Sequence, residues 1–434
     1  MSCLLNTEEI TESSELEEDF PYMLTDPNVF DFREIVENNK LKKRLSDEQI
    51  MQLGKLLVKF SAIFSTIPGK TNLVAHDIDL ISDKRVQRKP YRMTNRQNEI
   101  LKTEIERMLK YKIIETGPSK YTSPMILVET PGRDPRPCID YRKSNETTRT
   151  ELYPIPNIEQ RVETVAAAKF ITLIDLTKDY WQIPLSPRAQ RIAAFATSFG
   201  VYRPLWMSFG QNAPYYFSKM MNEILSGCEK YVTPYLDDIA IFSEAWEEHL
   251  KHLQEILERL KKVNLTIKPS KCKFAQLEVQ YLGHIVGRGK RSPAELKIEA
   301  IQNFPIPTTK TQIRSFLGLA GYYRKYSPMF SVIVVPLTDL LKGVNKKGGI
   351  VWNDKCSESF KMLKEKISGK PVLHAPDFSK PFILQTDASD QGYGVVLAQK
   401  DENGGEHPIL FLSRKFTATE RKYFTTEKEC AAIL

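Results

Sequence analysis

Apolar residues recur at helical spacing in several parts of the chain. The clearest segments are residues 45–60, 98–114, 246–263 and 311–326. In the first of them, Ser46 and Gln49 have the spacing of a capping box, which predicts that a helix begins there. In the third, one stripe along the helix is formed by Leu250, Leu253, Leu257 and Leu260.

Short runs rich in β-branched and aromatic residues lie between these helices and predict strands. The main runs are SPMILVET, FITLIDL, RIAAFAT, YLDDIAIF, VQYLGHIV, PFILQTDAS, GYGVVLAQ and PILFLS. The basic stretch 81–97 predicts an extended arm, and GVNKKGG at 343–349 predicts a linker after which the pattern restarts. Because strands and helices are mixed in both halves, the chain is expected to form α+β or α/β modules.

Composition adds a charge asymmetry to this picture. The 434 residues carry a net charge of +8, although residues 1–20 contain seven acidic and no basic side chains. The acidic head predicts a disordered tail, and the basic remainder suits a polyanionic partner. No apolar run reaches the roughly 18 residues of a membrane span, and the six cysteines form no CxxC pair, so neither a membrane protein nor a disulfide framework is expected.

Two adjacent carboxylates, Asp237 and Asp238, interrupt the apolar run YLDDIAIF. Adjacent acids are common at solvated turns, but here β-forming residues flank them on both sides. A tight hairpin would hold both carboxylates at one rigid tip, where hard divalent cations relieve their repulsion.

A third acid, Asp175, ends the strand run FITLID. Three carboxylates can bridge two metal ions for an in-line phosphoryl displacement. The alternative is that Asp175 only caps a turn, and the pattern alone leaves both open. His249 and His252 have an HxxH spacing but no further ligand beside them, so we expect them on the surface.

The chain resembles the reverse transcriptases of gypsy-type long-terminal-repeat retrotransposon polyproteins. The resemblance begins near residue 60 and runs in the family's order through KYTSPMILVE, PRPCIDYRKSN, FITLIDLTKDYWQIPL, MSFGQNAP, YLDDIAIFS, SKCKFAQLEVQYLGHIV and TQIRSFLGLAGYYRKY. It implies an α+β right-hand polymerase with fingers, palm and thumb, followed by a connection and a partial ribonuclease H-like α/β module. The implied domains are an acidic tail (1–27), helices and arm (28–95), fingers and palm (96–290), thumb and connection (291–375) and a truncated ribonuclease H-like domain (376–434).

The resemblance also assigns site residues. It implies a catalytic and metal-binding triad for two Mg²⁺ or Mn²⁺ ions, made of Asp175, Asp237 and Asp238. It implies nucleotide contacts from Arg136, Leu176, Tyr180, Phe209 and Gly210. It implies a primer-binding hairpin turn at Tyr281, Leu282 and Gly283. Each has a structural alternative as well: a surface charge for Arg136, core aromatics for Tyr180 and Phe209, and a turn for Gly283.

The C-terminal segment resembles the opening of a ribonuclease H domain, in which Asp387 and Glu429 match two metal-binding acids. Thr426 and Glu429 also have capping-box spacing, which offers a structural role for the glutamate. Because the chain ends at Leu434, we expect no ribonuclease H activity from it.

Several residues depart from the family pattern near the nucleotide pocket and the acidic bend. They are Glu129, Thr130, Asp179, Ser208, Gln211, Tyr215, Tyr216 and Pro234. Two functions therefore stay open: an RNA-directed DNA polymerase that adds dNTPs to a primer 3′-hydroxyl, and a decayed retroelement fragment that binds nucleic acid without catalysis. Either would act on an RNA template, a DNA primer and their hybrid, in the cytoplasm or nucleus and with no membrane, and the oligomeric state is not predicted.

Overall fold

The computed structural model describes residues 30–82, 85–129, 135–149, 154, 157–208, 210, 213–236, 238–343 and 350–433. The acidic head, most of the GVNKKGG linker, and the residues Asp237 and Phe209 lie outside this part of the chain. The described residues divide into two compact units, one formed by residues up to 156 together with Phe170–Gln276, the other by Asn157–Lys169 together with the residues from Leu277 on.

The first unit contains two sheets. The five-stranded sheet has the order β1-β6-β5-β2-β3, with bounds β1 (Ile114–Thr116), β2 (Ser123–Val128), β3 (Arg136–Ile139), β5 (Phe195–Thr197) and β6 (Gly200–Pro204). The four-stranded sheet has the order β7-β8-β4-β9, with bounds β4 (Phe170–Asp175), β7 (Val232–Tyr235), β8 (Asp238–Ser243) and β9 (Lys273–Gln276).

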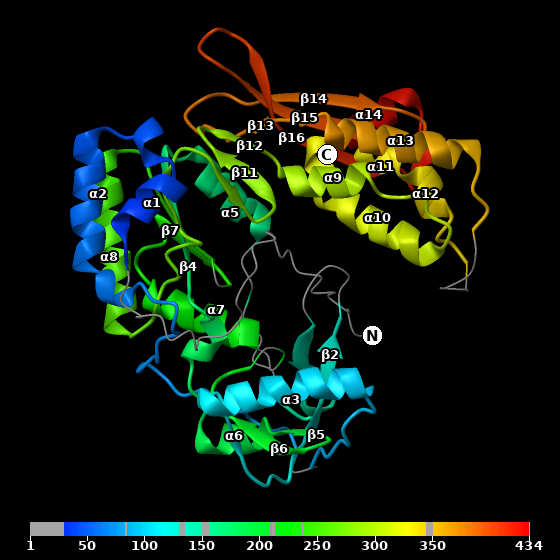
Figure 1. Cartoon of the computed structure of the whole chain (residues 1–434). Coiled ribbons are helices and arrows are strands. Elements are labelled where there is room, and N and C mark those ends of the chain that lie inside the picture. Colours follow the sequence, from blue (N-terminus) through cyan, green and yellow to red (C-terminus); the bar gives the residue numbers. More distant parts are fainter. Residues whose placement is uncertain are drawn as a thin grey trace. The chain divides into compact units, whose positions relative to one another are not determined.

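Helices cover both sheets of this unit (Figure 1). The helices described in this unit are α1 (Phe32–Asn38), α2 (Asp47–Lys59), α3 (Asn95–Lys110), α4 (Arg142–Asn145), α6 (Pro187–Ile192), α7 (Ala213–Ile224) and α8 (Trp246–Lys262), with 3₁₀ turns η1 (Leu41–Lys43), η2 (Ser61–Ile63) and η3 (Asp179–Gln182). α2 and α8 lie beside each other, and the predicted Leu253, Leu257 and Leu260 of α8 are fully buried. α3 buries Leu101 and Ile105 in a smaller core with Phe195 of the five-stranded sheet.

The capping box at Ser46 is confirmed, since its side chain accepts from the Gln49 amide and the Gln49 side chain accepts from the Ser46 amide. A second one, Thr94 with Gln97, starts α3 at Asn95, so the end of the predicted extended arm is helical. α3 ends at Lys110, earlier than predicted, because Lys112 adopts φ 53° and the chain then enters β1.

The second unit begins with α5 (Ile158–Ala167), which packs on a four-stranded sheet of order β10-β11-β12-β13. Its strands are β10 (Val279–Tyr281), β11 (His284–Gly287), β12 (Lys290–Pro293) and β13 (Leu373–His374). The run VQYLGHIV is therefore a hairpin rather than one strand. A helical core with fully buried Phe316 and Leu363 is built from α9 (Glu295–Gln302), α10 (Lys310–Tyr322), η4 (Arg324–Tyr326), α11 (Phe330–Ile333), α12 (Val335–Asp339) and α13 (Asp354–Ser368).

A three-stranded antiparallel sheet of order β14-β15-β16 closes this unit. Its elements are β14 (Ile383–Ala388), β15 (Gly392–Lys400), β16 (Glu406–Lys415), η5 (Glu420–Lys422) and α14 (Thr425–Ile433). α14 packs against β14 and β15 (Figure 1). Large apolar side chains remain exposed around this sheet, including Leu384 at 53% and Leu412 at 48%.

None of the helices in the described part of the chain combines the length and the apolarity that crossing a membrane requires.

Candidate functional site

Asp175 and Asp238 face each other across two antiparallel strands. Asp175 is the last residue of β4 and Asp238 the first of β8, and the ladder register pairs them directly. Side chains directly opposite in an antiparallel pair lie on the same face of the sheet, so two like charges meet there. The next pair in the ladder, Ile174 and Ile239, is fully buried, so the acids lie at the end of an apolar strand pair.

A two-residue turn separates β7 from β8, because Tyr235 pairs with Asp238. Leu236 begins that turn and adopts φ 53°, a left-handed conformation that costs a leucine free energy. β7 is an edge strand, which explains how the ladder accepts Pro234 opposite Ile239. The predicted hairpin is thus present, and the proline is compatible with it.

The backbone of Asp175 is fixed by a neighbouring segment of the same unit. Its carbonyl accepts a hydrogen bond from the Lys268 amide at 3.0 Å, and its amide donates to the Cys272 thiol at 3.5 Å. Burial raises the pKa of that thiol, and the negative charges of Asp175 and Asp238 raise it further. A neutral Cys272 therefore lies behind the two acids and adds no third negative charge.

Gln182 is a supporting residue that the sequence patterns did not single out. It is fully buried, its side-chain amide donates to the Thr177 carbonyl at 2.9 Å, and its side-chain oxygen accepts from the Thr266 amide at 2.7 Å. These bonds tie the segment after Asp175 to the chain near Lys268. The sequence signal that could have identified Gln182 is its position as the one amide side chain in the apolar run YWQIPL.

Tyr180 is buried at 6% exposure and meets Phe217 edge-on, with 5.5 Å between ring centroids. Leu176 directly follows the strand end, and its side chain is also buried, at 3% exposure. Arg136 begins β3, where its backbone pairs with Val128. These three residues belong to the same compact unit as the two acids, and their contacts with a nucleotide stay predictions.

The turn at Gly210 is held by residues that follow β3. Gly210 has φ 94°, and its carbonyl accepts a 2.7 Å hydrogen bond from Asn145. Tyr141 is fully buried; its hydroxyl donates to the Ala193 carbonyl at 2.9 Å, and a hydrogen bond from Ser208 opposes the rise that burial causes in its pKa. Ser208, a departure from the family pattern, therefore has a structural partner.

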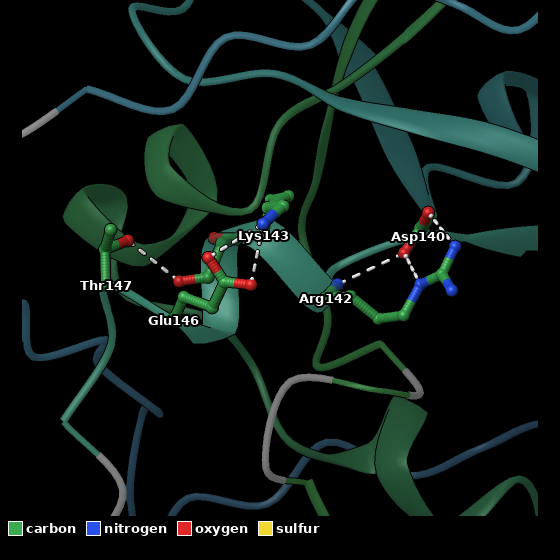
Figure 2. A network of polar contacts seen from close by, with 6 residues as sticks. Asp140, Arg142, Lys143, Glu146 and Thr147 are labelled. Atoms are coloured by element: carbon green, nitrogen blue, oxygen red, sulfur yellow. Dashed lines mark hydrogen bonds and ion pairs between the residues drawn. The ribbon is translucent and has the colours of Figure 1, made fainter. Parts of the chain in front are cut away.

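Asn145 lies on α4, whose start is fixed by the contacts in Figure 2. The Arg142 guanidinium donates to both carboxylate oxygens of Asp140, at 2.8 and 2.7 Å, and Tyr91 donates to one of them at 2.8 Å. The paired Arg142 holds the pKa of Asp140 well below its usual range. At the other end of the network, Lys143 pairs with Glu146 at 2.8 Å.

The prediction that His249 lies on the surface is wrong. Its side chain is fully buried, with Nε2 2.8 Å from the Thr172 hydroxyl and Nδ1 3.1 Å from the Ser243 hydroxyl. Ser243 also contacts His252, at 2.8 Å. Hydroxyl groups on β4 and β8 satisfy both ring nitrogens, so a histidine is tolerated in this core. Burial, reinforced by nearby His252, lowers the His249 pKa to about 3.

In the second unit, Tyr281 and His284 pair across another two-residue turn, whose residues Leu282 and Gly283 have φ 46° and 75°. Positive φ at both central residues is typical of a tight hairpin turn that follows the twist of its strands. The predicted primer-binding residues thus form one hairpin turn.

Asp387 and Glu429 also lie in the second unit. Asp387 is exposed on β14, and the Glu429 carboxylate on α14 accepts from the amide of the next residue on β14, Ala388, at 3.3 Å. The predicted capping box of Thr426 and Glu429 is wrong, because α14 begins at Thr425 and Glu427 accepts from the Phe424 amide instead. Glu429 thus lies close to the backbone of the strand that carries Asp387.

Among the described residues, no group of three or more histidine, cysteine or acidic side chains is arranged to hold a metal ion. Asp237, the third member of the predicted triad, is not among them. Two half-buried carboxylates of like charge on adjacent strands nevertheless suit a hard divalent cation, which prefers oxygen ligands.

Comparison with known proteins identifies the class. A family model described as reverse transcriptase (RNA-dependent DNA polymerase) matches residues 128–286, and one described as an RNase H-like domain found in reverse transcriptase matches residues 352–434. The structure resembles that of a foamy viral protease-reverse transcriptase in complex with double-stranded DNA, with TM-score 0.82, 24% identity, and coverage of 93% of this chain and 70% of that one. The structure of a foamy viral protease-reverse transcriptase in complex with an RNA/DNA hybrid has a TM-score of 0.77 and 24% identity. That match covers 95% of this chain and 56% of the viral chain.

The fold is therefore that of a reverse transcriptase polymerase followed by an RNase H-like module, as predicted. More specifically, the chain contains a reverse transcriptase region and an RNase H-like region, and its homologues include retrotransposon Pol polyproteins. It is 37% identical over 402 residues to the Pol polyprotein from transposon 297 of Drosophila melanogaster, covering 90% of this chain and 37% of that protein. The chain is also 33% identical over 425 residues to the Pol polyprotein from transposon gypsy of the same species. That match covers 94% of this chain and 40% of that protein. The chain thus spans less than half of the curated relatives it matches.

Proposed function

We propose that this chain is an RNA-directed DNA polymerase that adds dNTPs to a primer 3′-hydroxyl. The observation that carries the proposal is the direct pairing of Asp175 with Asp238 beside the Leu236 turn. The similarity of the surrounding residues to reverse transcriptases gives that pair its chemical context.

In this proposal, two Mg²⁺ or Mn²⁺ ions are held by the carboxylates of Asp175, Asp237 and Asp238 and by the Leu176 carbonyl. When bound, such ions activate the attacking hydroxyl and stabilise the leaving oxygen. Arg136 binds the triphosphate through its guanidinium, and Tyr180 excludes a 2′-hydroxyl from the sugar site. Phe209 and Gly210 border the nucleotide, and the turn 281–283 orients the primer end.

The proposed partners are an RNA template with a DNA primer, in the cytoplasm or nucleus. Solved relatives of this fold bind double-stranded DNA and an RNA/DNA hybrid, and the net charge of +8 favours a polyanion. Binding through the phosphate backbone should weaken steeply with salt.

The test is template-directed primer extension on RNA with Mg²⁺. The wild type should extend the primer, and Asp238→Asn should lose at least about a hundredfold in rate. Glu244→Gln is the matched control, since this exposed acid immediately follows the other end of β8 and should stay within twofold. Equal extension by wild type and Asp238→Asn would refute the proposal.

The alternative is a fragment that binds hybrid without catalysis. Ser208 and Pro234 now support it less, because each is accommodated by the surrounding structure. If wild type binds hybrid without incorporation, Asp179→Gly tests whether that residue is the defect, since restored incorporation would identify it.

A further inference from the structure

Two consecutive tyrosines bind the two consecutive carbonyls of the β10–β11 turn. Tyr322, the last residue of α10, donates its hydroxyl to the Leu282 carbonyl at 2.6 Å. Tyr323 donates its hydroxyl to the Gly283 carbonyl at 2.7 Å. The turn and the tyrosines lie in the same compact unit, although about forty residues separate them along the chain.

This pair of bonds acts on a turn that needs support. Leu282 adopts φ 46°, a conformation that is unfavourable for a residue with a side chain. A strained backbone persists only where its surroundings determine it. Here the Gly283 carbonyl accepts a second hydrogen bond, from the Ala294 amide at 3.1 Å.

The turn also fits closely against the tyrosine rings. A Cβ atom placed on Gly283 would be 3.4 Å from both the Tyr322 ring and the Tyr323 hydroxyl. Tyr323 is fully buried, whereas Tyr322 is 37% exposed beside the turn. The hydroxyl groups are therefore seated on the turn by packing as well as by hydrogen bonds.

His284 extends this contact to a third tyrosine. Its ring stacks on Tyr322 and Tyr326, with centroid distances of 5.3 and 5.6 Å, and its Nδ1 lies 2.8 Å from the Tyr326 hydroxyl. Tyr326 thus belongs to the same aromatic cluster but bonds a side chain instead of a turn carbonyl. It is a matched control for the loss of one hydroxyl.

We infer that Tyr322 and Tyr323 are positioning residues that hold the 282–283 turn in the conformation in which it presents the primer end. The role in presenting the primer rests on the proposed polymerase function. The two tyrosine–carbonyl hydrogen bonds, here called the tyrosine clamp, are present in the protein without nucleic acid. The tyrosines do not contact the reacting atoms; they act through the turn.

The first test compares Tyr322→Phe/Tyr323→Phe with Tyr326→Phe in primer extension. The double variant should raise the KM for primer–template about tenfold and leave the KM for dNTP within twofold. Tyr326→Phe should leave both within twofold. An unchanged primer KM in the double variant, or an equal rise in Tyr326→Phe, would overturn the inference.

The second test needs no catalysis. Amide hydrogen exchange of the hybrid-free protein should be at least about tenfold faster at Leu282 and Gly283 in the double variant and near wild type there in Tyr326→Phe. If the wild type shows no primer extension, the polymerase proposal fails. The affinity for an RNA–DNA hybrid is then measured in place of the KM for primer–template. Unchanged exchange at the turn, or unchanged hybrid affinity in the double variant, would then reject the clamp.

Discussion

The chain carries two pairs of acids for which the sequence resemblance predicts metal chemistry, and the surrounding structure differs between the two pairs. Asp175 and Asp238 end two strands whose neighbouring residues, Ile174 and Ile239, are fully buried. Asp387 is exposed on β14, a strand with no fully buried residue, and Glu429 accepts a backbone hydrogen bond from that strand.

The difference shows that the residues around a carboxylate determine whether it is suited to binding a metal ion. In the first pair, a buried strand pair holds two like charges opposite each other, an arrangement that suits a divalent cation. In the second, Glu429 accepts a hydrogen bond from the backbone, and the strand that carries Asp387 is exposed or only partly buried along its length. We therefore expect metal-dependent chemistry at the first pair.

The largest expected effect separates the two pairs directly. Asp175→Asn should reduce Mg²⁺-dependent incorporation by at least about a hundredfold, because it removes one of the opposed carboxylates. Glu429→Gln, which also neutralises one acid, should change incorporation less than twofold. Single-nucleotide incorporation on an RNA template measures both, and similar losses would remove the distinction between the pairs.

A stability comparison tests the strands that carry the acids. Thr172 on β4 contacts the buried His249 and accepts from the Ala275 amide at 3.0 Å. Thr172→Val should lower the free energy of unfolding by about 1–3 kcal/mol, because it leaves buried polar groups unpaired.

Thr386→Val in the partly exposed β14 is the matched control and should cost less than about 0.5 kcal/mol. Urea denaturation measures both changes. If Thr386→Val lowered the free energy of unfolding more than Thr172→Val, the buried strand β4 would not contribute more to stability than the exposed strand β14.

Acid should weaken both units through buried neutral histidines. Burial lowers the pKa of His249 and of His284 to about 3, from an ordinary 6.5, with added repulsion from His252 and Arg291 respectively. Between these pKa values the unfolded chain binds more protons, so stability is complete above about pH 6.5 and is lost as the pH falls toward 3.

For each histidine, the free energy of unfolding should fall by about 1 kcal/mol for each pH unit below about 6.5. Urea midpoints between pH 7 and pH 4 measure it, and His249→Gln should reduce the slope. A midpoint that stays constant over this range would show that the histidines are not held neutral.

The smallest effect concerns Ser208, close to the turn at Gly210. Ser208→Ala removes the hydroxyl that bonds the buried Tyr141 and should cost about 0.5–1.5 kcal/mol of stability. Thermal unfolding measures it, with the exposed Ser198→Ala as the control. No change at Ser208 would mean that this departure from the family has no structural role.

Much of the fold follows from local patterns in the sequence. The Ser46 capping box, the Leu253 stripe and the hairpin at YLDD depend on residues close together in the chain. The direct opposition of Asp175 and Asp238 depends on strand register, which spacing along the chain does not determine. Burial of His249 was missed for the same reason, because its partners Thr172 and Ser243 come from two other elements.

The same limit applies to the supporting residues of the site. Gln182 accepts a hydrogen bond from the amide of the distant Thr266, and Tyr322 donates one to the carbonyl of the distant Leu282. A backbone partner leaves little trace in the sequence, because every residue type except proline offers the same backbone groups. The resemblance to a family could assign the turn at 281–283, but the tyrosines that hold it emerge only from tertiary contacts.

The most direct test of the central claim is a double-mutant cycle of Asp175→Asn and Asp238→Asn, read by template-directed incorporation on RNA with Mg²⁺. If the two acids form one metal site, each single variant should lose about as much activity as the double variant, because groups that act as a unit are not additive. Losses that add between the two variants, or incorporation that survives in the double variant at the wild-type rate, would contradict it.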